Sequence, residues 1–109
     1  MAESSAHKKA KKQAAGPRGR TEVPLTRGRR LDAKTASGKR ATEVERSGKR
    51  AGLRAAVKRL NDSGSPQKEL RVPQRDLELA KEVAKQHARS AMTIKNISGS
   101  QRRQVRKPK

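Results

Sequence analysis

The chain has 109 residues, of which 30 are Lys or Arg and 10 are Asp or Glu, giving a formal net charge of +20, and it contains no Cys, Phe, Tyr or Trp. These counts exclude disulfides, zinc-thiolate sites, cysteine nucleophiles and base stacking on aromatic rings. A basic excess of this size indicates a polyanionic partner, because each cation that neutralises a phosphate releases condensed counterions.

The two ends of the chain are basic and lack apolar periodicity. We therefore expect residues 1–20 to be a disordered basic arm and residues 99–109 to be a disordered basic tail, leaving one small domain at residues 21–98. No segment approaches the roughly 20 apolar residues of a membrane span. The expected location is intracellular, in the cytoplasm or nucleoid, with no membrane partner.

Two short segments alternate apolar and charged residues as strands do, RLDAK at 30–34 and ATEVE at 41–45. Ser37 and Gly38 between them are typical of a tight hairpin turn. If these two residues form the loop, the numbers of facing residues add to 75. The predicted cross-strand pairs are then Leu31 with Val44, Ala33 with Thr42, Arg30 with Glu45, and Asp32 with Glu43.

The second half of the chain alternates between helical and extended patterns. Helical spacing at 49–62 is followed by a short strand at 68–73, a second helix within 73–90 and a strand at 92–98. This order predicts an α/β domain with a small mixed sheet, a β-hairpin followed by αβαβ, in which helical crossovers connect the later strands.

The predicted core is small because it contains no aromatic residue. A core of this size contributes little stability, so a bound polyanion, a metal or homo-oligomerisation would add to it. The residues expected to form it are Leu25, Leu31, Val44, Leu53, Val57, Leu60, Leu70, Val72, Leu77, Leu79, Val83, Met92, Ile94 and Ile97.

Asp32 and Glu43 face each other in the predicted hairpin, where like charges are destabilising. Two explanations remain open on the sequence alone. In the first, Arg30, Lys34 and Arg46 neutralise the two carboxylates on a solvated face. In the second, the carboxylates bind Mg²⁺, which takes one or two carboxylates together with water and phosphate oxygens.

An Asp on one hairpin strand, then an acid, a spacer and a third residue on the next, followed by helix, strand, helix and strand, resembles the PD-(D/E)xK nuclease fold. The resemblance implies metal-dependent phosphodiester hydrolysis with Asp32 and Glu43 as metal ligands and Mg²⁺ as the cofactor. Glu45 stands where the family usually has Lys and would be the third catalytic residue, orienting the attacking water. Leu31 stands where the family often has Pro.

The residues expected to contact phosphates lie along the predicted first helix and beside it, and in the C-terminal tail: Arg30, Arg46, Lys49, Arg50, Arg54, Lys58, Arg102 and Arg103. A solvated helix face is the alternative explanation for this spacing of charges. Neither His7 nor His87 is expected to be catalytic.

The leading functional hypothesis is binding of DNA or RNA through the phosphate backbone with little sequence readout, and with no small-molecule substrate. The first alternative is a nuclease, active or degenerate. The second is a ribosome- or nucleoid-associated structural protein, and the third is a disordered chain that orders on its partner.

Overall fold

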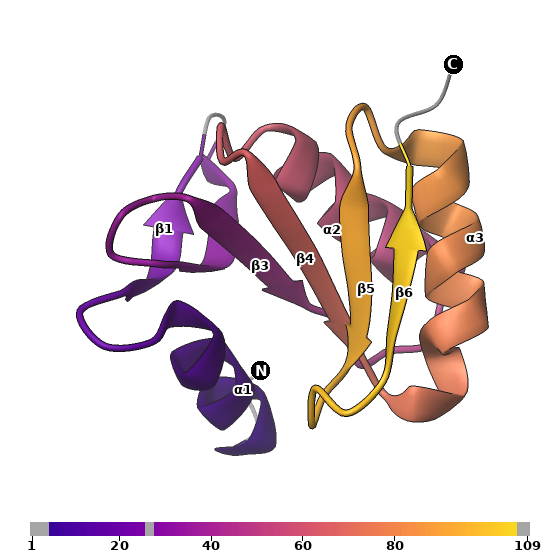
Figure 1. Ribbon diagram of the computed structural model, residues 1–109, viewed down its shortest axis with the longest axis horizontal. Helices are drawn as coiled ribbons and strands as arrows, with labels where there is room; N and C mark the ends of the chain where they lie inside the picture. Colours follow the sequence, from indigo (N-terminus) through magenta and orange to yellow (C-terminus); the bar gives the residue numbers. More distant parts are fainter. Residues whose placement is uncertain (1–4, 26–27, 107–109) are drawn as a thin grey trace.

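The computed structural model describes residues 5–25 and 28–106 (Figure 1). In chain order the elements are α1 (Ser5–Ala15), β1 (Arg20–Pro24), β2 (Arg30–Lys34), β3 (Arg40–Val44), α2 (Arg50–Asn61), β4 (Gln67–Val72), a single 3-10 turn (Gln74–Asp76), α3 (Leu77–His87), β5 (Met92–Asn96) and β6 (Arg102–Val105).

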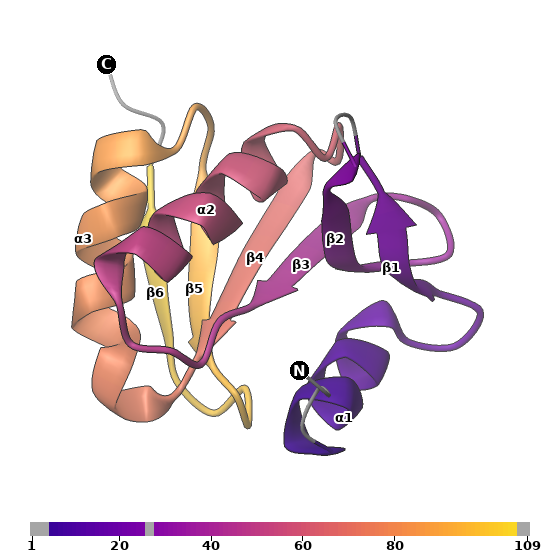
Figure 2. The ribbon, with the colours of Figure 1, turned by 180° about the vertical axis from the view of Figure 1, so that it is seen from behind.

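The six strands form one mixed sheet in the order β1-β2-β3-β4-β5-β6. The pairs β1–β2, β2–β3 and β5–β6 are antiparallel, whereas β3–β4 and β4–β5 are parallel. The two parallel pairs require crossovers, which α2 and α3 provide. Both helices lie on the same face of the sheet: in Figure 2, α2 crosses in front of β4 to β6 and α3 lies beside β6. The predicted α/β class with a mixed sheet is therefore confirmed.

The predicted hairpin register is correct where β2 and β3 pair. Ala33 pairs with Thr42, as expected, and Lys34 pairs with Ala41, whose number also completes the sum of 75. Gly38 has a φ of +76°, which a residue with a side chain rarely adopts, so the glycine permits this turn. Within the described residues, the backbone pairing of β2 with β3 ends at Ala33 and Thr42 and does not extend to Asp32 and Glu43.

Leucine, valine, isoleucine and alanine side chains fill the space between the sheet and the two helices. Leu53 and Leu60 on α2, and Leu70 and Ile94 on the central strands, are fully buried. The apolar face predicted for the first crossover helix is thus correct, because Arg54 and its neighbouring cations lie on the opposite, exposed face. Most of the predicted core residues are buried, and those that are only partly buried are Leu25, Leu79 and Ile97.

The structure differs from the prediction in both basic ends. Residues 5–15 form helix α1, whose Ala14 and Ala15 pack on Ala33 of the sheet. Residues 102–105 form β6, whose Val105 side chain enters the core. Small alanine side chains and a single valine give these segments enough apolar surface to dock, despite their charge. Residues 1–4 of the predicted arm and 107–109 of the predicted tail lie outside the described residues.

None of the helices in the described part of the chain is long and apolar enough to cross a membrane.

Candidate functional site

Asp32 and Glu43 do come together, at the point where β2 and β3 separate. The backbone N–H of Asp32 donates to Oε2 of Glu43 over 2.7 Å, and the backbone N–H of Val44 donates to Oδ2 of Asp32 over 2.7 Å. Each carboxylate thus accepts a hydrogen bond from the opposite strand. The two side chains replace the ladder bonds that are missing between the separating strands.

Arg59 of α2 contacts the buried carboxylate from the helix side. Its Nε donates to Oε1 of Glu43 over 2.5 Å. Glu43 has 0% relative exposure, whereas the Arg59 side chain keeps 27%. The first explanation offered by the sequence is therefore wrong in its details. Glu43 does not lie on a solvated face, and α2 rather than the hairpin supplies its cationic partner.

The pKa values of both carboxyl groups are raised above their ordinary values. Burial and the neighbouring Asp32 charge raise the pKa of Glu43 to about 8, despite the opposing effect of Arg59. Burial also raises the pKa of Asp32, although the Val44 hydrogen bond and nearby cations act against it. The pair therefore keeps a proton at pH values where exposed carboxyl groups have lost theirs.

Helix α1 places two further basic side chains beside Asp32. Nε2 of His7 lies 3.8 Å from Oδ2 of Asp32, and Nζ of Lys11 lies 4.0 Å from Oδ1. Lys11 is only 2% exposed and also hydrogen-bonds to Glu22 of β1. Sequence reasoning missed these contacts because α1 was expected to be disordered. The available signal was the spacing of Lys11 with the buried residues Ala14 and Ala15 on one helical face.

Glu45 does not join the pair. Its Oε1 accepts the backbone N–H of Ser47 over 3.0 Å. Its Oε2 also lies close to Gly52 of α2: a side chain at position 52 would place its Cβ 3.0 Å from this oxygen. Of the three predicted catalytic acids, the structure brings two together and directs the third toward the first turns of α2.

In the folded chain, partners within the protein already engage the pair of carboxyl groups. Asp32 N–H and Arg59 occupy the two oxygens of Glu43, and the raised pKa favours its neutral form, which is a poor ligand. No group of three or more His, Asp or Glu side chains suited to a metal occurs within the described residues. We therefore derive no chemistry through a metal at Asp32 and Glu43, and the Mg²⁺ hypothesis stays a prediction.

The predicted phosphate-contacting residues are spread over several faces. Arg50 and Arg103 form ion pairs with Glu82 and Glu78 of α3, at 3.0 Å and 2.8 Å. Six others are exposed, and most of them lie on α2 or in the loop before it: Arg30, Arg46, Lys49, Arg54, Lys58 and Arg102. The structure therefore does not gather the eight residues into one patch.

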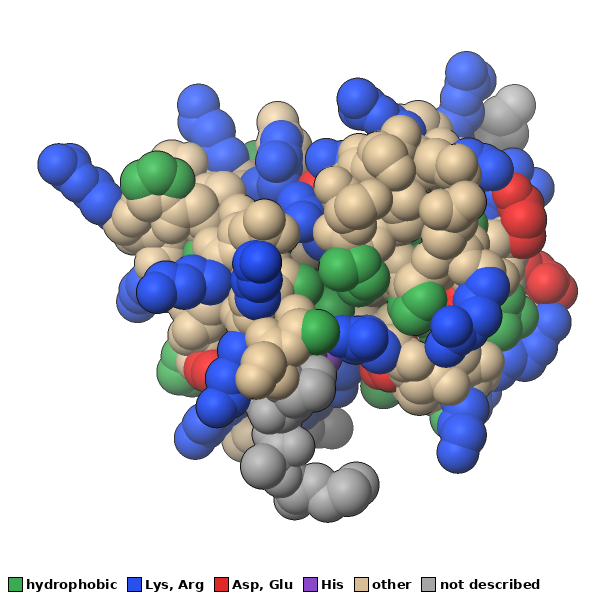
Figure 3. Space-filling model, turned by 90° about the horizontal axis from the view of Figure 1, so that it is seen from below, with side chains coloured by type: hydrophobic (Ala, Val, Ile, Leu, Met, Phe, Trp, Pro, Cys, Tyr) green, Lys and Arg blue, Asp and Glu red, His purple; other side chains and the backbone are tan. Residues whose placement is uncertain are grey.

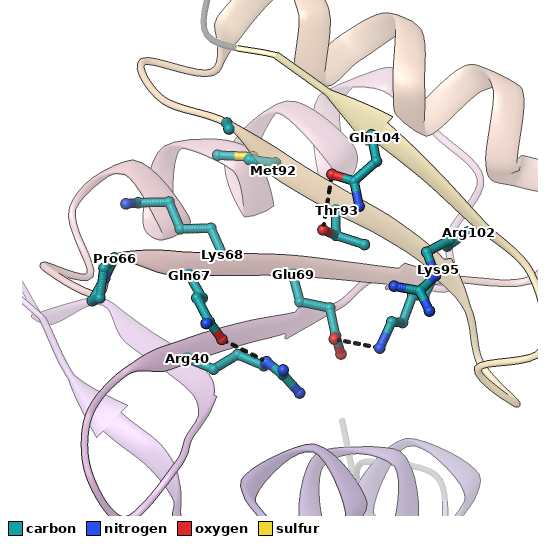
Figure 4. A pocket seen from close by; sticks show the side chains of 11 residues that line it. Arg40, Pro66, Gln67, Lys68, Glu69, Met92, Thr93, Lys95, Arg102 and Gln104 are labelled. Atoms are coloured by element: carbon teal, nitrogen blue, oxygen red, sulfur yellow. Dashed lines mark hydrogen bonds and ion pairs between the residues drawn. The ribbon is translucent and has the colours of Figure 1, made fainter.

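A second cluster of polar residues, most of them on the sheet face opposite α2 and α3, was largely missed by sequence reasoning. The cluster lines a hollow of about 310 Å³. Figure 4 shows its side chains. Arg102 was predicted to contact nucleic acid, but the other polar lining residues were not: Arg40, Gln67, Lys68, Glu69, Thr93, Lys95 and Gln104. The available signal was the alternation of polar and apolar residues in each of these strands.

In comparisons with known proteins, the chain matches no family model, no curated protein and no solved structure.

Proposed function

We propose that this protein binds nucleic acid through the phosphate backbone, with little sequence readout. The observation that carries the proposal is the internal use of the acidic residues. Within the described residues, the acids that form ion pairs with Lys, Arg or His of the same chain, some buried and some on the surface, are Glu22, Asp32, Glu43, Asp62, Glu69, Glu78 and Glu82. Most of the described basic side chains outside these ion pairs are exposed.

The exposed cations lie on more than one side of the fold. Arg54 and Lys58 are exposed on α2, and Arg46 and Lys49 are exposed in the loop that precedes it. Figure 3 shows Lys and Arg side chains distributed across the lower face, with few Asp and Glu side chains among them. A surface of this kind favours a polyanion with regularly spaced charges, and nucleic acid is the partner with that chemistry.

The composition also restricts how such binding would work. Because the chain has no aromatic residue, bases cannot stack on aromatic side chains. Contacts to phosphate fix the position of a protein on nucleic acid but carry no sequence information directly. We therefore expect affinity to depend on salt and on strand geometry more than on base sequence.

Equilibrium binding at near-physiological salt tests the proposal. Fluorescence anisotropy of labelled oligonucleotides, single-stranded and duplex, should show saturable binding at roughly 0.15 M salt. The dissociation constants are expected at or below the roughly 10⁻⁴–10⁻⁶ M typical of non-specific complexes. Polyglutamate at equal charge concentration is the control competitor. Absence of saturable binding, or equally effective displacement by polyglutamate, would contradict the proposal.

Metal-dependent hydrolysis of nucleic acid is a second candidate. The observation that favours it is the adjacency of Asp32 and Glu43 at the separation of β2 and β3, where the nuclease resemblance expects two acids. Its test is cleavage of supercoiled plasmid, linear duplex and RNA with Mg²⁺ or Mn²⁺, beside EDTA controls and Glu43→Gln. Cleavage lost in the variant would support an enzyme. No cleavage, or equal cleavage, would remove the support for catalysis and leave a binding protein.

A further inference from the structure

The sheet has one covered and one open face. Along β4 and β5, Leu70, Val72 and Ile94 point toward α2 and α3 and are fully buried. The alternate residues, such as Thr93 and Lys95, point the other way. Helix α1 contacts β1, β2 and β3, at the other end of the sheet. Among the described elements, no helix therefore packs over the outer face of β4 to β6.

This open face contains the hollow of about 310 Å³ introduced above. Its polar lining comes from four different strands: Arg40 of β3, Gln67 of β4, Thr93 and Lys95 of β5, and Arg102 and Gln104 of β6. In Figure 4 these side chains project from the strands around the hollow. The four strands hold positively charged groups and hydrogen-bonding groups at fixed spacings, about 4.8 Å from one strand to the next.

The acid at the floor of the hollow is neutralised within the fold. Glu69 is 2% exposed, and its oxygens lie 2.5 Å from Nε of Arg71 and 3.1 Å from Nζ of Lys95. Burial alone would raise the pKa of Glu69, but the hydrogen bonds and charges of Arg71 and Lys95 outweigh it and lower that pKa. Together with Arg40 and Arg102, the hollow carries a positive charge that is not cancelled.

The hydrogen bonds between the lining side chains are long and can be exchanged. Nε of Arg40 donates to Gln67 over 3.4 Å, and the Thr93 hydroxyl donates to Gln104 over 3.4 Å. Both distances are at the upper limit of a hydrogen bond, so a better partner can replace either bond at small cost. The amide and hydroxyl groups are therefore available to a ligand.

The size of the hollow selects among nucleic acids. A volume of about 310 Å³ is at the lower end of pockets for small ligands, which span roughly 300–1,000 Å³. One nucleotide of an unpaired strand has this scale, whereas a duplex presents a stiff cylinder whose bases are stacked inside. A single strand can turn a sugar and a base into the hollow while its flanking phosphates reach the cations.

We propose that this hollow binds one nucleotide of a single-stranded nucleic acid, with Arg40 and Arg102 on the phosphates and Gln67, Thr93 and Gln104 on the sugar and base edges. The inference rests on the proposed function and deepens it by naming the strand class and the surface. Side-chain amides and hydroxyls replace the aromatic platform that other single-strand binders use.

The test is a pair of double variants with equal loss of charge. Arg40→Gln with Arg102→Gln removes two exposed cations from the hollow, and Lys85→Gln with Arg89→Gln removes two exposed cations at the end of α3 and just beyond it. Anisotropy is measured with single-stranded RNA, single-stranded DNA and a duplex of the same length. Because all four side chains are exposed, we expect both variants to fold, and thermal melting checks this.

The first variant should lose roughly tenfold or more in affinity for single strands, and less for duplex, whereas the control should lose about threefold or less for all ligands. Tighter binding of single-stranded RNA than of single-stranded DNA would support a hollow that also contacts the 2′-hydroxyl of the sugar. Equal losses in the two variants, or a loss as large for duplex as for single strands, would overturn the inference while the proposed function stands. If the unmodified protein binds no nucleic acid, both fail.

An independent measurement locates the contact. With a short oligonucleotide, NMR chemical-shift changes should concentrate in the backbone amides of β4, β5 and β6 and in the side-chain amides of Gln67 and Gln104. Changes concentrated on α2 instead would overturn the assignment of the surface, whatever the affinities.

Discussion

Arg59 of α2 donates from Nε to Oε1 of Glu43 on β3 over 2.5 Å, and thereby joins the first crossover helix to the point where two strands separate. The same carboxylate accepts the backbone N–H of Asp32. The acids gathered in the middle of a very basic chain thus have a structural role in this fold. They satisfy backbone donors and a partly buried guanidinium where the sheet ladder is interrupted.

Replacing Arg59 should destabilise the protein, because Glu43 would remain buried without its cationic partner. We expect Arg59→Met to lower the free energy of unfolding by about 3 kcal/mol at pH 9, as measured by urea denaturation. The loss should be smaller at pH 6, where Glu43 is protonated. The control is Lys58→Met at the exposed neighbouring position, expected to change stability by about 0.5 kcal/mol or less. Equal effects of the two variants would contradict this role.

The stability of the protein should depend on pH through Glu43. The folded pKa of Glu43 is about 8, against an ordinary value of 4.5, so between these values the folded state holds a proton that the unfolded state has released. The contribution of this group to the free energy of unfolding therefore falls as pH rises from about 4.5 to 8, by no more than the roughly 1.4 kcal/mol per pH unit that one proton can contribute. Glu43→Gln should flatten this part of the pH profile of the melting temperature. An unchanged slope in the variant would show that other groups set it.

Docking of α1 should depend on its alanine face. Ala14 is 7% exposed and packs with Ala15 on Ala33, so Ala14→Glu would bury a carboxylate at that contact. We expect trypsin to cut the α1 lysines several times faster in this variant. Gln13→Glu places the same charge on the exposed side of the helix and should leave cleavage unchanged. Similar cleavage of both variants would indicate that α1 does not depend on this packing.

The core should tolerate little loss of volume, because it has no aromatic side chains to compensate. Leu60 is fully buried between α2 and the sheet. We expect Leu60→Ala to cost about 2–5 kcal/mol, a large part of the stability of a domain of this size, and Ile94→Val about 0.5–1.5 kcal/mol. Urea titrations of the two variants measure both values. A Leu60→Ala variant as stable as Ile94→Val would mean that the core repacks freely.

The central part of the fold was predictable because its periodicities are strong. The spacing of Leu53, Val57 and Leu60 specified a helix with one apolar face, and Ser37–Gly38 specified the hairpin register. The ends were not predictable in the same way. In α1 the buried face consists of alanine and the stem of Lys11, and in β6 a single valine enters the core. Hydrophobicity alone does not detect such weak apolar surfaces.

The site was only half predictable. The pairing rule placed Asp32 opposite Glu43, and the structure brings these residues together. The rule could not show that Glu43 is buried, because burial depends on where α2 packs. Arg59 was not among the residues singled out on this helix, although it lies three residues after Ala56 and directly before Leu60, on the edge of the apolar face. The hollow on the open face required the strand order, since its residues come from four strands.

The most direct test of the central claim is the salt dependence of nucleic-acid affinity. Binding through phosphates predicts that log K falls linearly with log salt, with a slope of about 0.7 per phosphate neutralised on a single strand. We expect a slope corresponding to several phosphates and saturable binding that persists at roughly 0.15 M salt. Affinity that is independent of salt, or that vanishes well below that concentration, would contradict the account.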